Sequence, residues 1–401
     1  MPPAPRSGIA LVLAGGAARG AYEVGVVEHV VEEVAKDLGR EVPLDILCGT
    51  SIGALNACAL AAFADDPRGR AARLAAVWTA LRLEDLIKPD LRGILSLGAR
   101  WLRGTREGGL VDPTGLERLI ESVIPFAAIE DHLQAGRLEA LTVSTTHIAT
   151  GRTVVFVHRR EGDLPPWSLD PTIFPRAVRI APQHAFASAA IPLLFRAVRI
   201  DGELHCDGGL RQNVPLSPAR RLGARAVLVV NPRYIPPLSG EAPGHIEPDA
   251  FAGPVFLLGK TLNALLLDRV DTDLARLRSI NDILEAGCRR YGEGFVDEIN
   301  EALGHPKGRG MRPMRSLLVR ASVDIGKLAI DYVTSETFAR RVGGAAGRLL
   351  RLIAERDSPD ESDLLSYLLF DGEFAGRLLE VGRADARARH AELCAFFDAA
   401  L

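Results

Sequence analysis

The chain has 401 residues, 47% of them hydrophobic, which is enough for one large domain or two ordinary ones. Its 48 Lys and Arg residues nearly balance 51 Asp and Glu residues, so the net charge gives no indication of a nucleic-acid partner. The five cysteines are scattered without a Cys-x-x-Cys pair, which argues against a disulfide framework and a zinc site and favours a reducing compartment.

No segment reaches the ~18 uninterrupted apolar residues of a membrane span. Residues 8–18 share features with a short signal peptide, but a first strand followed by a Gly-rich turn explains them better. We therefore expect a cytoplasmic protein whose contact with membranes is peripheral.

Short apolar runs followed by helix-like segments recur through the first half of the chain. Since strands that alternate with helices form mostly parallel sheets covered on both faces, we predict an α/β fold. The predicted strands are Ile9–Leu13, Leu44–Cys48, Leu141–Ser144, Thr153–Val157 and Ala226–Val230.

The first predicted strand runs into a turn with the sequence Gly15-Gly16-Ala17-Ala18-Arg19-Gly20. Consecutive backbone N–H groups of such a turn can point into one concavity and hold an anion. A nucleotide phosphate is one candidate anion, but neither the Gly-x-Gly-x-x-Gly fingerprint nor a Walker lysine is present.

The second predicted strand is followed by Ser51 between two glycines, in "LCGTSIGALNAC". Gly49 and Gly53 leave room for an abrupt strand-to-helix turn, which presents the Ser51 hydroxyl beside a helix N-terminus that favours developing negative charge. Ser51 is therefore a candidate nucleophile, and its alternative role is a helix N-cap.

Residues 93–104, "GILSLGARWLRG", form an amphipathic stretch with arginines beside its apolar face. It is either a helix packed on the sheet or an interfacial lid that lies on lipid.

A third stretch, "HCDGGLRQNVPLSPA", places Asp207 before Gly208 and Gly209, at a sharp turn where another loop can approach closely. Together with the Gly-flanked serine and the anion-binding turn, this carboxylate is predicted to be functional.

Residues 232–254 are rich in Pro, Gly and acidic side chains and are predicted as a long loop at a domain boundary. We divide the chain into a catalytic α/β region, 1–235, and a mainly helical region, 236–401, packed on or regulating the first. In the second region we expect a strand at Ser316–Ala321 and helices at 255–277, 281–303, 335–355 and 362–381.

In order along the chain, "GGAARGAY", "GTSIG", "ASAAIP" and "DGG…NVP" resemble the patatin-like phospholipases over residues ~8–230. The resemblance implies a doubly wound fold, hydrolysis of lipid acyl esters, and a dyad of Ser51 as nucleophile and Asp207 as its only partner. It also implies an oxyanion hole made by the N–H groups of Gly15, Gly16 and Ala17, with Arg19 in a supporting position.

Ala17 departs from the family pattern, which has a third glycine there. Because a positive φ would cost alanine ~1 kcal/mol, we expect an ordinary φ at Ala17. A Ser–His–Asp arrangement is the competing hypothesis, with His184 and His205 as candidates. The remaining histidines, including His29 and His390, are interpreted as surface or core groups.

The sequence thus predicts a serine acyl hydrolase that acts on lipid or phospholipid esters without a metal or other cofactor. The alternative is a catalytically silent or ligand-regulated protein of the same fold that senses or scaffolds. Head-group preference and oligomeric state are not predicted.

Overall fold

The protein is described here from a computed structural model. The structure describes residues 8–86, 111–160, 171–192, 194–235, 270–305, 310–343 and 363–399, and isolated positions between these ranges. The amphipathic segment 93–104 and most of the predicted boundary loop lie outside the described residues.

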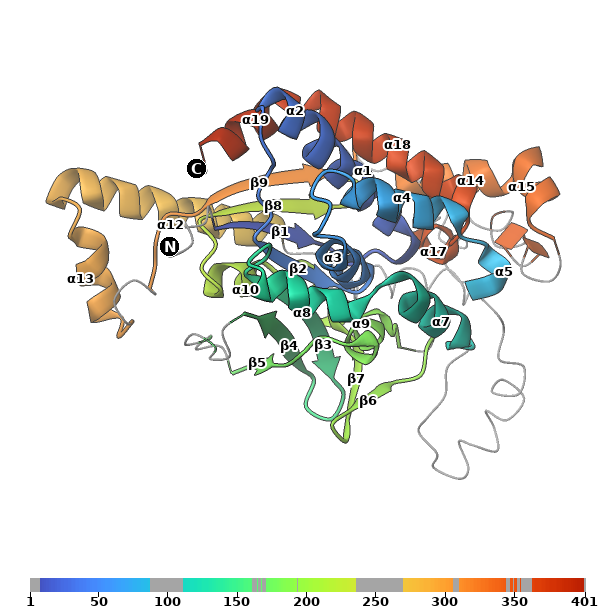
Figure 1. The fold of residues 1–401 in the computed structure, drawn as a ribbon, viewed down its shortest axis with the longest axis horizontal. Helices are drawn as coiled ribbons and strands as arrows, with labels where there is room; N and C mark the ends of the chain where they lie inside the picture. The colour runs from blue at the N-terminus through green and yellow to red at the C-terminus, as the bar shows by residue number, and fades with distance from the viewer. Residues whose placement is uncertain are drawn as a thin grey trace, which may run out of the picture.

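A nine-stranded mixed sheet forms the centre of the molecule (Figure 1). Its main path runs β5-β4-β3-β2-β1-β8-β9, while β7 pairs with β3 and β6 pairs with β7. Neighbouring pairs along this path are parallel except β3–β4, and the β3–β7 and β6–β7 pairs are also antiparallel. The strands are β1 (Ile9–Leu13), β2 (Ile46–Thr50), β3 (Ala140–His147), β4 (Arg152–Arg159), β5 (Ile173–Ala177), β6 (Val198–Ile200), β7 (Glu203–Asp207), β8 (Ala226–Asn231) and β9 (Arg315–Arg320).

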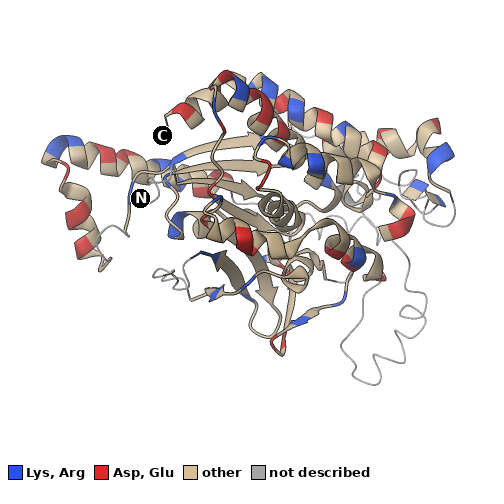
Figure 2. Ribbon diagram, in the orientation of Figure 1, with Lys and Arg blue, Asp and Glu red and all other residues tan. Residues whose placement is uncertain are grey.

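Helices cover both faces of this sheet, which confirms the doubly wound α/β prediction. Ile9, Leu11 and Leu13 of β1 join one apolar core, whereas Ala10 and Val12 join another, because successive side chains of a strand point to opposite faces. Figure 2 shows charged residues on the surrounding helices, and β1, β2 and β8 carry none. A strand buried on both faces has this continuous apolar sequence.

The larger core lies under helices from both halves of the chain. Helices of the first half are α1 (Gly20–His29), α2 (Ala35–Asp37), α3 (Ile52–Ala62), α4 (Arg70–Ala80), α5 (Leu83–Leu86), α7 (Thr114–Val123), α8 (Phe126–Gln134), α9 (Pro182–Ala189) and α10 (Leu216–Arg221). Those of the second half are α12 (Val270–Tyr291), α13 (Phe295–Ala302), α14 (Ile325–Val333), α15 (Glu336–Arg341), α17 (Asp363–Leu368), α18 (Gly372–Ala388) and α19 (His390–Asp398).

The five predicted strands are present, with bounds shifted by a few residues except in β1. β5, β6 and β7 were not predicted. In the second half, the helix expected over 335–355 is wrong in extent: a helix ends at Val333, and Ser335 caps α15 by accepting from the Phe338 N–H. The helix expected over 362–381 is divided before Asp371, whose carboxylate caps α18.

Elements from both sides of the expected boundary at residue 235 share one sheet and one helical layer. β9 pairs in parallel with β8, and α18 packs along α1 (Figure 1). The Cα atoms of Gly25 and Gly382 face each other across this helix pair: a Cβ on Gly382 would lie 2.2 Å from the Tyr22 carbonyl oxygen. The division at residue 235 stays a prediction, and this close contact provides a way to probe it.

All five cysteines are free thiols. Among the described residues, every helix is too short or too polar to cross a bilayer.

Candidate active site

The register of the sheet brings the end of β2 and the end of β7 together. Both strands pair with β3: Thr50 of β2 lies opposite Ser144, and Asp207 of β7 lies opposite Thr145, the next residue of β3. Because β2 runs parallel to β3 and β7 runs antiparallel to it, the two strands end at the same point from opposite directions. The residue after β2 is Ser51, which therefore lies beside Asp207.

Ser51 occupies a strained turn between β2 and α3. Its φ of 56° and ψ of −128° are unusual for a residue with a side chain. The turn leaves no space for neighbouring side chains, since a Cβ on Gly53 would lie 2.5 Å from the carbonyl oxygens of Leu13 and Ala14. The Ser51 N–H donates to Ser188 Oγ at 2.9 Å, and Ser188 Oγ donates to the Ser144 carbonyl at 2.7 Å. This relay fixes the turn to both α9 and β3.

The Ser51 hydroxyl donates directly to Asp207. The distance from Ser51 Oγ to Asp207 Oδ2 is 2.6 Å, and Asp207 Oδ1 accepts from the Gly209 N–H at 2.7 Å. Asp207 is 1% exposed, and this burial raises its pKa from 3.8 to about 7, although both hydrogen bonds act in the opposite direction. A carboxylate with this pKa accepts a proton near neutral pH far better than an ordinary aspartate.

Neither candidate histidine contacts the Ser51 hydroxyl in the described structure. His205 pairs through Nδ1 with Thr145 Oγ1 at 3.0 Å, and burial lowers its pKa to about 4. His184 uses Nδ1 to accept from the Ala181 N–H at the start of α9. The geometry therefore gives the competing Ser–His–Asp hypothesis no support.

The Gly-rich turn after β1 lies against Ser51. A Cβ on Gly15 would be 3.1 Å from the Ser51 Cβ and 2.2 Å from Asn213 Oδ1, so only glycine fits there. The Gly15 N–H donates to the Asn213 carbonyl at 3.1 Å and is already satisfied. Within the part of the chain that the structure describes, the N–H groups of Gly16 and Ala17 have no hydrogen-bond partner.

The expectation of an ordinary φ at Ala17 is wrong, because its φ is 48°. The turn adopts the left-handed conformation despite the methyl group, at a cost of ~1–2 kcal/mol. Ala17 forms a small apolar cluster with Ile191 and Tyr367, and burial of its methyl offsets part of that cost, by ~0.8 kcal/mol.

Arg19 links this turn to the C-terminal half of the chain. Its Nε donates to Ser366 Oγ at 2.8 Å, and its guanidinium lies 4.2 Å from the centre of the Tyr367 ring. Gly208, on the other side of the site, is close to backbone, since a Cβ there would be 2.3 Å from the Ser144 carbonyl oxygen. Arg19 and Gly208 thus lie in the two loops that flank Ser51, and their supporting roles stay predictions.

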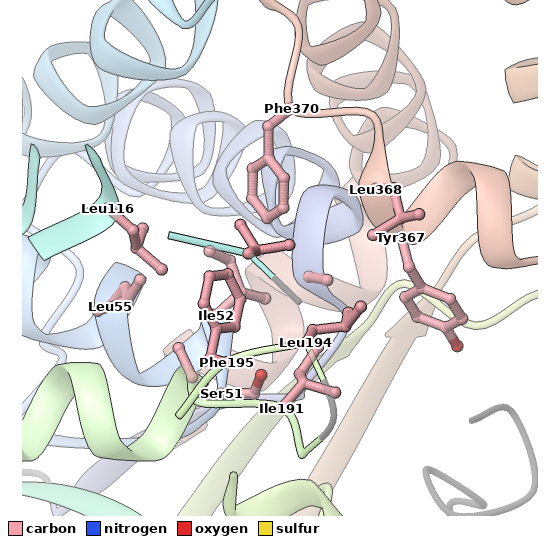
Figure 3. A pocket seen from close by; sticks show the side chains of 13 residues that line it. Ser51, Ile52, Leu55, Leu116, Ile191, Leu194, Phe195, Tyr367, Leu368 and Phe370 are labelled. Atoms are coloured by element: carbon pink, nitrogen blue, oxygen red, sulfur yellow. The ribbon is translucent and has the colours of Figure 1, made fainter. Parts of the chain in front are cut away.

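Ser51 opens into an apolar cavity of about 660 Å³, counting its mouth (Figure 3). Its walls come from α3, from the segment after α9 and from the C-terminal half. The main lining side chains are Ile52, Leu55, Leu116, Ile191, Leu194, Phe195, Tyr367, Leu368 and Phe370. A second apolar pocket, of about 490 Å³ when the open space at its mouth is counted, shares Ile52, Leu55, Leu116 and Phe370 with the first.

Sequence reasoning missed Ser188 and the residues at 366–370 that reach the site. Ser188 lies within the quoted "ASAAIP" block, so the signal was available. No spacing in the sequence connects Tyr367, Leu368 or Phe370 with Ser51.

A family model described as "Patatin-like phospholipase" matches residues 11–220, more than half of the chain. The chain belongs to the patatin-like phospholipase family. Its matched segment contains Ser51 and Asp207, and membership supports a lipid hydrolase in general terms.

Two curated relatives show how distant the individual similarities are. Patatin-like phospholipase domain-containing protein 7 of Rattus norvegicus is 27% identical over 224 residues, which cover 56% of this chain and 13% of that protein. Uncharacterized protein YjjU of Escherichia coli (strain K12) is 28% identical over 225 residues, covering 55% of this chain and 51% of that protein. The match thus spans about half or less of either relative.

Among solved structures, VipD from Legionella pneumophila is 13% identical to this patatin-like chain. The comparison covers 89% of this chain and 66% of VipD, with a TM-score of 0.30.

Proposed function

We propose that the protein is a serine acyl hydrolase that cleaves fatty-acyl esters of lipids or phospholipids through a Ser51–Asp207 dyad. The observation that carries the proposal is the 2.6 Å hydrogen bond between Ser51 Oγ and Asp207 Oδ2 beside an apolar cavity. A hydroxyl, a base and an apolar wall are the parts that hydrolysis of a fatty-acyl ester requires.

In the acylation step Ser51 Oγ attacks the ester carbonyl carbon while its proton passes to the Asp207 carboxylate. The oxyanion that forms accepts hydrogen bonds from the N–H groups of Gly16 and Ala17, which have no other partner among the described residues. When the tetrahedral intermediate collapses, Asp207 returns the proton to the leaving alcohol oxygen. Gly15 keeps a positioning role, since its N–H is bound to Asn213.

In the deacylation step water replaces the alcohol. The water oxygen attacks the acyl carbonyl carbon while Asp207 takes a proton from the water. Asp207 then passes this proton to Ser51 Oγ, which leaves as the free hydroxyl. The products are a fatty acid and the deacylated lipid, and no metal or nucleotide takes part in either step.

The apolar cavity supports a fatty-acyl group as the part of the substrate that is bound beside Ser51. Its lining is aliphatic and aromatic, and burial of each CH₂ of a chain is favourable by ~0.8 kcal/mol. The head group then faces the mouth of the cavity, where contact with a lipid surface is peripheral. Arg19, beside the proposed oxyanion hole, contacts Ser366 and Tyr367 of the C-terminal half. These contacts support the hypothesis that region 236–401 packs on or regulates the catalytic region, 1–235.

The experiment is fatty-acid release from mixed phospholipid liposomes by the full chain, with products separated into fatty acid and lysolipid. We expect Ser51→Ala to reduce release to the uncatalysed level. Ser122→Ala is the matched control, because Ser122 is far along the chain on α7 and its hydroxyl bonds only to the Leu119 carbonyl among described residues. Equal release by wild type and Ser51→Ala would exclude the proposal.

A further inference from the structure

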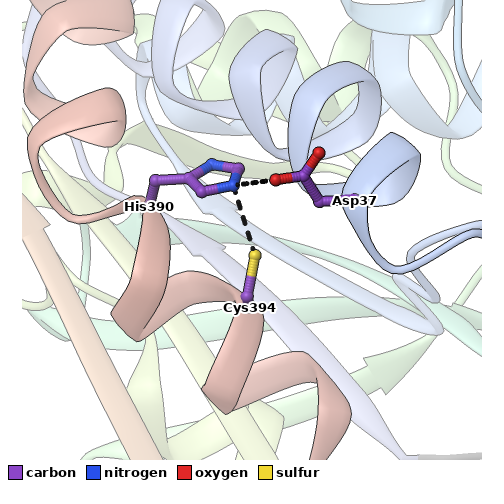
Figure 4. Close-up of side chains that lie close together, drawn as sticks. All are labelled: Asp37, His390 and Cys394. Carbon is purple, nitrogen blue, oxygen red and sulfur yellow. Dashed lines mark hydrogen bonds and ion pairs between the residues drawn. The ribbon is translucent and has the colours of Figure 1, made fainter.

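Three metal-ligating side chains from opposite ends of the chain meet away from the dyad (Figure 4). Asp37 ends α2, while His390 and Cys394 lie one turn apart on α19. His390 Nε2 is 2.8 Å from Asp37 Oδ2 and 3.4 Å from Cys394 Sγ. The proposed hydrolysis uses none of these groups.

We propose that Asp37, His390 and Cys394 bind a Zn²⁺ ion. Their ligand atoms all lie within 4.8 Å of one another. Tetrahedral zinc, with bonds of ~2.0–2.3 Å to oxygen, nitrogen and sulfur, separates its ligand atoms by roughly 3.3–3.8 Å, so small side-chain movements place an ion between them. The set combines a thiolate, an imidazole and a carboxylate, which together suit zinc better than magnesium or calcium.

A fourth side chain, His29, contacts His390 and gives further support to this assignment. His29 of α1 is 6% exposed, and its Nε2 lies 3.0 Å from His390 Nδ1. We infer that in the metal-bound state His390 donates its Nδ1–H to His29 Nε2. That hydrogen bond directs the Nε2 lone pair of His390 toward Asp37 and Cys394, as outer partners do for metal-bound histidines.

Binding balances charge and protons. The Cys394 thiol loses its proton to solvent, and the thiolate and the Asp37 carboxylate together neutralise the ion. The Asp37 side chain is 60% exposed, so the fourth position faces solvent and takes a water molecule. Because α2 and α19 come from opposite ends of the chain, the ion fastens the last helix to the first helical segment, where Arg40 also pairs with Asp398.

The experiment titrates CoCl₂ into metal-free, reduced full-length protein and follows the near-ultraviolet and visible absorption. A thiolate ligand in a tetrahedral site produces intense sulfur-to-cobalt charge-transfer bands that octahedral or thiol-free binding lacks. We expect one cobalt per chain with such bands, and displacement of the cobalt by added Zn²⁺.

Three variants make the titration specific. Cys394→Ser and His390→Gln should abolish the charge-transfer bands and weaken binding at least about tenfold. Cys288→Ser is the matched control, because Cys288 is a half-exposed thiol on α12 outside the cluster. This variant should leave the charge-transfer bands and the cobalt affinity unchanged.

Thermal unfolding gives a second measurement. Zn²⁺ should raise the midpoint temperature of unfolding of the wild type and of Cys288→Ser, and EDTA should reverse this rise. Neither Zn²⁺ nor EDTA should change the midpoint temperature of Cys394→Ser. Absence of charge-transfer bands in the wild type, or equal bands in Cys394→Ser, would overturn the proposal. Circular dichroism of each metal-free variant shows whether it is folded.

Discussion

Ser51 donates its hydroxyl proton in a 2.6 Å hydrogen bond to Asp207, a residue 156 positions further along the chain. The register explains this contact, since β2 and β7 end opposite consecutive residues of β3. A base that touches the nucleophile directly needs no imidazole between them, provided that its proton affinity is high enough. Burial of Asp207 supplies that affinity and leads to the first two predictions.

The rate of ester hydrolysis should rise with pH through about 7, because Asp207 accepts a proton only when it is ionised and its pKa is about 7. Below that value the protonated fraction grows, so kcat/KM should fall roughly tenfold per pH unit. Initial rates on a soluble ester whose own charge does not change over this range measure the profile. A flat profile between about pH 5 and pH 9 would contradict the assignment of Asp207 as base.

Asp207→Asn should make the protein more stable above neutral pH. The folded-state pKa is raised above the unfolded value, so the folded state prefers protonated Asp207 and loses stability as pH rises from about 4 to about 7. The amide removes this penalty, on the order of a few kcal/mol. Its oxygen can accept from Gly209, while its NH₂ donates to Ser51.

Urea unfolding at about pH 8 and about pH 4 measures this effect: the gain should be present at the higher pH and vanish at the lower one. Ser51→Ala is the control, because it leaves the buried carboxylate in place. A variant that is less stable than wild type at about pH 8 would show that ionised Asp207 stabilises the fold.

Replacement of Ala17 by glycine should relieve the strain of its φ of 48°. Ala18 is the matched control, since it is 1% exposed but has no positive φ. Both variants lose a buried methyl and gain backbone conformational entropy in the unfolded state. The strain of the positive φ at Ala17 is therefore the difference between them. We expect Ala18→Gly to lower the free energy of unfolding by about 1–2 kcal/mol more than Ala17→Gly. Equal losses would show that the turn carries no strain.

The contact between α1 and α18 should make the C-terminal region necessary for stability. A methyl at position 382 would lie 2.2 Å from the Tyr22 carbonyl oxygen, whereas a methyl at position 376 would meet no atom of the described residues within 4 Å. We therefore expect Gly382→Ala to lower the free energy of unfolding by ~1–3 kcal/mol. In contrast, Gly376→Ala should raise it by ~0.5–1 kcal/mol.

Chemical denaturation of both variants, followed by intrinsic fluorescence, provides the comparison. A harmless Gly382→Ala would indicate that α18 rests loosely on α1, as expected of a separable region after residue 235.

The sequence predicted the parts of this fold whose signal is local. β1 was located at its observed bounds because burial on both faces requires an uninterrupted apolar run. The turn at Ser51 followed from the space that Gly49 and Gly53 leave. β6 and β7 were missed because they form a short hairpin with polar residues, such as Arg199 and Glu203, that breaks any apolar run.

Contacts between distant segments were beyond such reasoning. Ser366 and Tyr367 of α17, and Phe370 in the link between α17 and α18, reach the site, and nothing local in the sequence relates them to Ser51. Asp37 and His390 are 353 positions apart, so the spacing of the cysteines in the sequence gives no indication of the side-chain cluster at which we propose a zinc ion. At Ala17 a local rule failed because the geometry of the turn outweighed the preference of alanine for negative φ.

The most direct test of the account is the rate at which a fluorophosphonate probe modifies the full chain, with the labelled residue identified by peptide mass spectrometry. Wild type and His205→Gln should both be labelled at Ser51, at similar rates, because in the proposed dyad Asp207 alone takes the Ser51 proton. Asp207→Asn should remain folded and unlabelled. Labelling of Ser51 that survives in Asp207→Asn but disappears in His205→Gln would contradict the dyad and make a histidine the base.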